Sequence, residues 1–350
     1  MRSFRFFVIT CSLMLILTQG MGFSVFAQTY GDYPAPDAMV AEIQALAVDF
    51  PGHAEIVEYG RSVEGRPLLA VRIAADPAVQ KPPALIAASI HGNEWIANRV
   101  AMAAALRLLN GYGNDAWVDG MLARMDFYVI PCINPDGYYK TYEMLANPSI
   151  PWRNGRKNAN RVDINRNFPL PAERTMDVAM AGVDDDPDHE RYTGPHPYSE
   201  PESRAIRDFV AAHPFFASVD LHSNWGTIFP PKCNTKGCEK QFQKMCGAGI
   251  ARQKNIKYPC IMARNVDSFS GEMEDALFYD FGVMAVCWET FTTKAADEQK
   301  QRMEHMFWGQ NPEDIAWWTD NDADGVLAAL EAAFDVTKGQ PIPEKHRQVK

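Results

Sequence analysis

Residues 83–94, Pro-Ala-Leu-Ile-Ala-Ala-Ser-Ile-His-Gly-Asn-Glu, decide the fold class and locate the first candidate site. Their apolar run predicts a buried strand over Ala84–Ile90. Helical periodicity follows over 95–110, which places His91 and Glu94 on a strand-to-helix turn. An imidazole and a carboxylate three residues apart on a turn can bind one metal ion. The alternative is a surface histidine beside a helix N-terminal glutamate.

Strand and helix patterns alternate along the rest of the chain. We predict helices over Pro36–Phe50, Ser203–Ala212 and Glu272–Tyr279, and strands over Ala54–Tyr59, Leu68–Ile73, Phe127–Ile133, Ala217–His222 and Val283–Trp288. There is no internal repeat and no low-complexity linker. The pattern predicts a single α/β domain, with a mixed, mostly parallel twisted sheet and helices on both faces. Ligands of such sheets bind beyond the carboxyl ends of the strands.

The first 27 residues differ from the rest of the chain. They hold Arg2 and Arg5, no acidic residue and a long apolar run, which is typical of a secretory signal peptide cleaved after Ala27. An uncleaved membrane anchor is the alternative. We therefore expect a signal peptide at 1–27, a catalytic domain at 28–338 and a disordered tail at 339–350, in a secreted or periplasmic protein without membrane attachment after cleavage.

The composition is that of an ordinary globular protein, with 47% hydrophobic and 22% charged residues over 350 positions. The formal net charge of −10 becomes −12 once Arg2 and Arg5 leave with the signal peptide. Nucleic-acid binding needs a basic face, so we expect no nucleic-acid partner.

Six cysteines remain after the signal peptide, an even number that suits disulfide bonds in an exported protein. Four cluster between Cys233 and Cys260, where bridges are expected. A four-cysteine zinc site is the alternative, but the cluster has no Cys-x-x-Cys pair. Cys132 and Cys287 lie in apolar runs and are expected to be buried thiols.

A third candidate metal ligand, His222, ends the predicted strand over Ala217–His222. With His91 and Glu94 it would leave a coordination position open for water, as catalytic zinc sites do. Glu289 ends another apolar strand and is a candidate general base, with a paired structural glutamate as the alternative. Asn165 and Arg166 belong to an Asn-Arg-Asn sequence that suits carboxylate binding or a solvated turn.

From Pro36 to Phe291 the chain resembles the zinc carboxypeptidases of the carboxypeptidase A type. Motifs similar to the landmarks of that family occur in its order: Gly60-Arg61-Ser62-Val63-Glu64-Gly65-Arg66, His91-Gly92-Asn93-Glu94, Asn134-Pro135-Asp136-Gly137, Val162-Asp163-Ile164-Asn165-Arg166-Asn167-Phe168, Ser199-Glu200-Pro201-Glu202, His222-Ser223 and Glu289.

The resemblance implies a role for each matching residue. It implies one zinc ion held by His91, Glu94 and His222, with Glu289 as the base that activates water. Asp163 would orient His91, and Asn165 and Arg166 would bind the terminal carboxylate of the substrate. Trp152-Arg153-Asn154-Gly155-Arg156 is similar to the family's Trp-Arg-x-x-Arg segment, so Arg153 would polarise the scissile carbonyl, with Arg156 as the alternative.

The chain departs from the family at the mobile tyrosine. Residues 266–270 contain no tyrosine, and Asp267 falls near its position. Glu274, fifteen residues before Glu289, falls where the family sets side-chain preference. An acid there favours a C-terminal lysine, arginine or diaminopimelate, unless Glu274 points to solvent.

The sequence thus predicts an exported zinc metallocarboxypeptidase acting on peptides. Three alternatives remain open. The first is a murein-peptide amidase or carboxypeptidase acting on muropeptides, because residues 156–160 look like the bacterial wall enzymes. The others are a catalytically silent carboxylate-binding protein of the same fold and a small-molecule zinc deacylase.

Overall fold

The computed structural model describes residues 31–146, 155–169, 184–231, 233, 235–262, 271–301 and 306–347. The predicted signal peptide, Arg153 and Asp267 lie outside these residues. Within them, no helix is long and apolar enough to cross a membrane.

The described residues form one mixed sheet covered by helices. The strands are β1 (Ala54–Arg61), β2 (Pro67–Ile73), β3 (Pro83–Ala88), β4 (Asp126–Ile130), β5 (Ala217–Ser223), β6 (Thr227–Phe229) and β7 (Met284–Thr290). The α-helices are α1 (Pro36–Asp49), α2 (Trp95–Gly111), α3 (Ala116–Leu122), α4 (Pro135–Ala146), α5 (Pro201–Ala212), α6 (Lys236–Arg252), α7 (Met273–Phe281), α8 (Thr293–Lys300) and α9 (Ile315–Thr337). Short 3-10 helices are η2 (Ile164–Arg166), η4 (Met306–Gly309) and η5 (Glu344–His346).

The sheet has the order β1-β2-β4-β3-β5-β7-β6. The four central strands, β4, β3, β5 and β7, are parallel, whereas β1, β2 and β6 pair antiparallel with their neighbours. This confirms the predicted fold class. The central strands are buried along almost their whole length because both faces are covered, which explains their continuous apolar runs.

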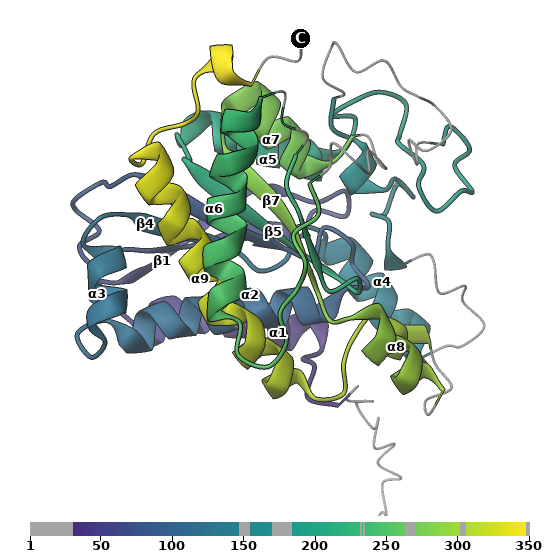
Figure 1. Ribbon diagram of the computed structural model, residues 1–350. Helices are drawn as coiled ribbons and strands as arrows, with labels where there is room; N and C mark the ends of the chain where they lie inside the picture. The colour runs from purple at the N-terminus through teal and green to yellow at the C-terminus, as the bar shows by residue number, and fades with distance from the viewer. Residues whose placement is uncertain are drawn as a thin grey trace, which may run out of the picture.

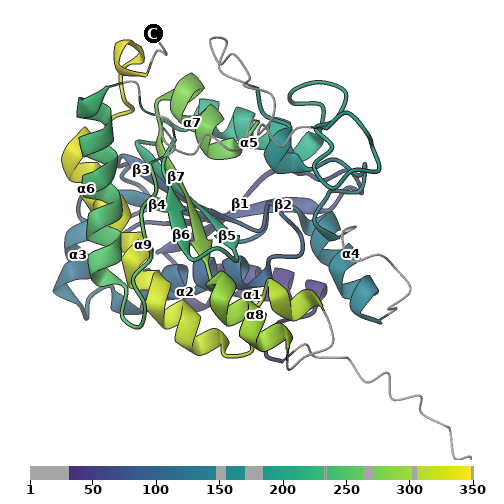
Figure 2. The same cartoon turned by 45° about the vertical axis from the view of Figure 1, so that its right-hand side comes forward.

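Two hydrophobic cores fill the two faces of the sheet. On one face, buried side chains of α1, α2, α6 and α9 pack on alternate residues of β3, β5 and β7. On the other, α5 and α7 pack on the intervening residues. Figure 2 shows α5 and α7 on one side of the sheet and α1, α2 and α9 on the other, while α6 lies beside α9 (Figure 1).

The structure tests two further predictions, on the cysteines and on the C-terminal tail. Cys233 and Cys238 form a disulfide, whereas Cys246 and Cys260 are free thiols and do not form a second bridge in this cluster. Cys132 and Cys287 are buried free thiols, as predicted. The tail after Lys338, expected to be disordered, instead packs on α7 as far as Arg347: the Ile342 N–H donates to the Gly282 carbonyl at 2.7 Å, and Arg347 donates to the Tyr279 carbonyl at 2.6 Å. The apolar Ile342 is the residue that holds it there.

Candidate active site

The turn after β3 presents His91 and Glu94 at the carboxyl edge of the sheet. It is held tightly against α4, because a Cβ on Gly92 would lie 2.1 Å from the backbone of Gly137. The Gly92 carbonyl accepts hydrogen bonds from Trp95 Nε1 at 2.9 Å and from Thr141 Oγ1 at 3.0 Å. Glycine is therefore required between the two polar residues.

Parallel pairing brings the remaining residues to the same edge. In the register of β3 and β5, Ala88 pairs with Leu221, so His222 lies just beyond the end of β3. In the register of β5 and β7, His222 pairs with Glu289. The parallel sheet thus gathers residues separated by almost 200 positions.

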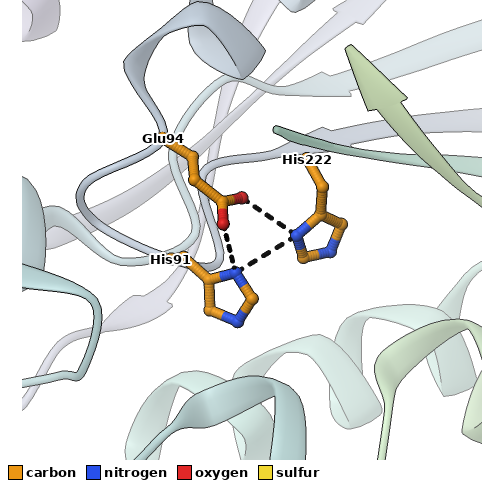
Figure 3. Close-up of side chains that lie close together, drawn as sticks. All are labelled: His91, Glu94 and His222. Carbon is orange, nitrogen blue, oxygen red and sulfur yellow. Dashed lines mark hydrogen bonds and ion pairs between the residues drawn. The ribbon is translucent and has the colours of Figure 1, made fainter. Parts of the chain in front are cut away.

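The side chains of His91, Glu94 and His222 converge on one point, as Figure 3 shows. His91 Nδ1 lies 2.8 Å from Glu94 Oε1, His222 Nδ1 lies 3.0 Å from Glu94 Oε2, and the two Nδ1 atoms are 3.2 Å apart. One ligand atom from each residue lies within 4.8 Å of the others, and all three residues are buried. Two imidazole nitrogens and a carboxylate are the donor set of a catalytic zinc site.

The electrostatics of this group also suit a cation. Burial raises the pKa of Glu94, but His91 and His222 outweigh burial and hold the pKa well below its usual value. Glu94 is therefore a carboxylate, the form that binds metal. The described residues fit Zn²⁺ in their number, donor type and convergence.

Asp163 lies behind His91, with Oδ1 3.3 Å from His91 Nε2. Its Oδ2 accepts hydrogen bonds from Arg156 Nε at 3.0 Å and from Arg156 Nη2 at 2.9 Å. Burial raises the pKa of Asp163, but Arg156 and His91 hold it well below 3.8. Arg156, the alternative to Arg153 for polarising the carbonyl, is therefore engaged in fixing Asp163. Its Nη1 lies 3.2 Å from His91 Nδ1.

Glu289 lies at the end of β7 beside His222. The backbone N–H of Trp225 donates to its Oε2 at 3.4 Å. Burial raises the pKa of Glu289 to about 7, with a further increase from Glu94 and an opposing effect from His222. A carboxylate with a pKa near neutrality can both accept and return a proton.

Asn165 and Arg166 lie on η2, which begins where Asp163 Oδ1 accepts a hydrogen bond from the Asn165 N–H at 3.1 Å. Asn165 Nδ2 lies 3.4 Å from His222 Nε2, and Asn165 Oδ1 accepts from the Met273 N–H at 2.8 Å. Arg166 Nη1 forms an ion pair with Glu272 Oε1 at 3.3 Å. The structure therefore places Asn165 beside His222, and Arg166 follows it on η2 with Glu272 as an ion-pair partner.

Glu274 is buried, with 3% of its surface exposed, so the solvent-facing alternative is wrong. Its Oε2 has no hydrogen-bond partner among the described residues. Burial, Glu272 and Asp220, in that order, raise its pKa well above 4.5.

Two carboxylates near the site, Glu272 and Asp220, were not predicted from the sequence as site residues. Glu272 begins the predicted helix over Glu272–Tyr279, and the sequence gives no signal that it faces Arg166, 106 positions earlier in the chain. Asp220 lies two residues before His222, and the two-residue repeat of a strand places both side chains on one face. That repeat was a usable signal.

Comparison with known proteins agrees with this geometry. The family model for zinc carboxypeptidases matches residues 39–309, so the chain belongs to the zinc carboxypeptidase family. Mouse (Mus musculus) carboxypeptidase A4 is 31% identical over 197 residues, which are 55% of this chain and 45% of that protein. An inactive metallocarboxypeptidase ECM14 of Ajellomyces capsulatus is 27% identical over 291 residues, 73% of this chain and 47% of that protein.

The solved structures support the fold. Thrombin-activatable fibrinolysis inhibitor matches with a TM-score of 0.69 and 23% identity, covering 87% of this chain and 75% of that chain. The chain spans about half the length of the curated relatives described above.

Proposed function

We propose that this chain is an exported, zinc-dependent metallocarboxypeptidase that hydrolyses the C-terminal peptide bond of peptides. The observation that carries the proposal is that three convergent metal ligands and Glu289 lie at one sheet edge, and that η2, which carries Asn165 and Arg166, contacts His222 through Asn165. Export is supported by the apolar N-terminal run and by the Cys233–Cys238 disulfide, since disulfides persist in oxidising compartments.

Each residue has a chemical task in this proposal. Arg166 and Asn165 hold the terminal carboxylate of the substrate and so choose the last peptide bond. A bound zinc ion would polarise the scissile carbonyl and lower the pKa of water. Glu289 removes a proton from the attacking water as its oxygen bonds to the carbonyl carbon. It then gives that proton to the leaving amine as the carbon–nitrogen bond breaks. Arg153 is proposed to stabilise the negative charge on the carbonyl oxygen.

The proposed preference is for a cationic C-terminal residue. Its support is Glu274, a buried acid with an unpartnered oxygen, close enough to Asp220 and Glu272 for their charges to act on it. Buried acids of this kind attract a cation. Lysine, arginine and diaminopimelate each carry one, so plain peptides and muropeptides are both candidate substrates.

The test uses the zinc-loaded protein and matched peptides that differ only in a C-terminal lysine, phenylalanine or glutamate. Mass spectrometry should show release of the last residue, fastest for lysine, and no release from the same peptides with a C-terminal amide. A chelator should abolish release and added zinc should restore it. Preferred release of phenylalanine would contradict the cationic preference, and a muropeptide series would decide between the two substrate classes.

A catalytically silent binding protein is the second candidate, because relatives named inactive metallocarboxypeptidases match 73% of the chain. The presence of Glu289 beside a complete ligand set supports the enzyme instead. Hydrolysis by the zinc-loaded protein distinguishes the two: a protein that binds one zinc ion, binds peptides with a free carboxylate and hydrolyses none of them is the silent protein.

A further inference from the structure

Asp220 contacts the second histidine of the metal group. It lies on β5 with 1% of its surface exposed, and its Oδ2 is 3.1 Å from His222 Nε2. The other ring nitrogen of His222 faces Glu94 and His91. The two nitrogens of this ring therefore have separate partners, one in the metal group and one on the strand.

The position of the hydrogen atom on the His222 imidazole determines the role of Asp220. A neutral imidazole carries one N–H, and a nitrogen that binds a metal ion must be bare. If Nδ1 of His222 faces the ion, Nε2 carries the hydrogen and needs an acceptor. The Asn165 amide nitrogen, 3.4 Å away, is itself a donor, because Asn165 Oδ1 accepts from the Met273 N–H. The Asp220 carboxylate is the acceptor at this nitrogen.

A carboxylate also lies near the corresponding nitrogen of His91, at a longer distance and without hydrogen-bond geometry. Asp163 lies 3.3 Å from Nε2 of His91, as Asp220 lies 3.1 Å from Nε2 of His222. Each histidine thus has its own carboxylate. A carboxylate behind a ligating imidazole fixes the ring and raises its basicity.

We infer that Asp220 is a positioning residue that holds His222 in the orientation and tautomer required to bind the metal ion through Nδ1. The inference rests on the proposed metal site but not on the proposed substrate. It predicts that metal affinity depends on Asp220 even though Asp220 does not belong to the ligand set.

Glu274 offers a matched control. It is a second buried acid close enough to His222 for their charges to interact, yet no hydrogen bond joins it to that ring among the described residues. Asp220→Asn and Glu274→Gln each replace a buried carboxyl group with an amide of the same shape. Only Asp220→Asn weakens the acceptor at His222 Nε2.

The experiment measures the zinc dissociation constants of the full chain, the two amide variants and Asp220→Ala by competition with a chromophoric chelator. We expect Asp220→Asn to weaken zinc binding about tenfold and Asp220→Ala up to about a hundredfold, and Glu274→Gln to change it less than threefold. The visible spectrum of the cobalt-substituted protein should change in the Asp220 variants alone.

Equal zinc affinities for Asp220→Asn and the unmodified chain, with circular dichroism showing both folded, would overturn the inference. So would equal weakening by Asp220→Asn and Glu274→Gln, because the effect would then not be specific to the acceptor at His222 Nε2. Substrate preference reports separately on the proposed function, since Glu274→Gln should alter the ratio of lysine to phenylalanine release while Asp220→Asn should leave that ratio unchanged.

Discussion

Arg166 forms an ion pair with Glu272, with Arg166 Nη1 3.3 Å from Glu272 Oε1. The pair is largely buried, since 4% of the Arg166 side chain and 20% of the Glu272 side chain are exposed. The segment that carries Glu272 is fixed there: a Cβ on Gly271 would lie 2.5 Å from the Arg166 carbonyl oxygen, and Phe168 donates to the Gly271 carbonyl. The candidate carboxylate-binding arginine therefore faces a carboxylate of its own chain.

Replacing Glu272 with glutamine should tighten substrate binding. The substrate carboxylate would no longer compete with Glu272 for Arg166, a charge-assisted interaction worth about 1 kcal/mol here, or about fivefold in KM. Steady-state kinetics on a peptide with a free C-terminus should show the lower KM at nearly constant kcat. An unchanged or higher KM would mean that Glu272 does not compete with the substrate.

Substitution of Arg153 and substitution of Arg156 should have different effects on the enzyme. Arg156 holds Asp163 through two hydrogen bonds, so Arg156→Ala should mainly weaken zinc binding. Arg153→Ala should instead lower kcat by about two to three orders of magnitude while the protein keeps its zinc. Zinc content and kcat, measured on both variants, distinguish the roles. A large loss of kcat in zinc-saturated Arg156→Ala, with an unchanged kcat in Arg153→Ala, would instead assign the polarising role to Arg156.

Glu202 should make stability depend on pH. Burial raises its pKa from 4.5 to about 7, while hydrogen bonds from Asn158 and the Val63 N–H oppose the shift. The folded chain then binds more protons than the unfolded chain between these values, so Glu202 favours the folded state at low pH and this contribution is lost as pH rises toward 7.

Glu202→Gln cannot ionise and serves as the reference. Between pH 5 and pH 8 the free energy of unfolding of the unmodified chain should fall by about 2 to 3 kcal/mol relative to that of Glu202→Gln. Urea unfolding of both proteins at the two pH values measures this difference. A constant difference would show that Glu202 titrates normally in the folded state.

The sheet could be predicted because its strands are marked by short apolar runs with glycine or proline at their ends. The structure confirms β3, β5 and β7 within two residues of their predicted bounds. Five helices were not predicted: α3, α4, α6, α8 and α9. The longest of these, α9, contains Gly325 in its interior, and a Cβ at that position would lie 3.1 Å from the Gly249 carbonyl of α6. Close helix packing determines that residue, and a single sequence does not reveal the partner helix.

The candidate site, like the fold, could be predicted only in part. His91, Glu94, His222 and Glu289 could be located because each lies at, or a few residues after, the carboxyl end of a recognisable strand. Glu272 could not be ranked in advance, because its importance depends on which side chain faces it across the fold, whereas the two-residue repeat of β5 already places Asp220 on the same face as His222. Arg166 meets Glu272 only when α7 packs on η2, a contact between residues 106 positions apart.

The most direct test of the account is hydrolysis by the zinc-loaded chain and by its Glu289→Gln variant on a peptide ending in lysine. The account predicts release of the terminal lysine by the unmodified chain and a loss of kcat of about two to four orders of magnitude in the variant, with one zinc ion bound in both. Equal rates in the two proteins, or no release by the zinc-loaded unmodified chain from any peptide with a free C-terminus, would contradict it.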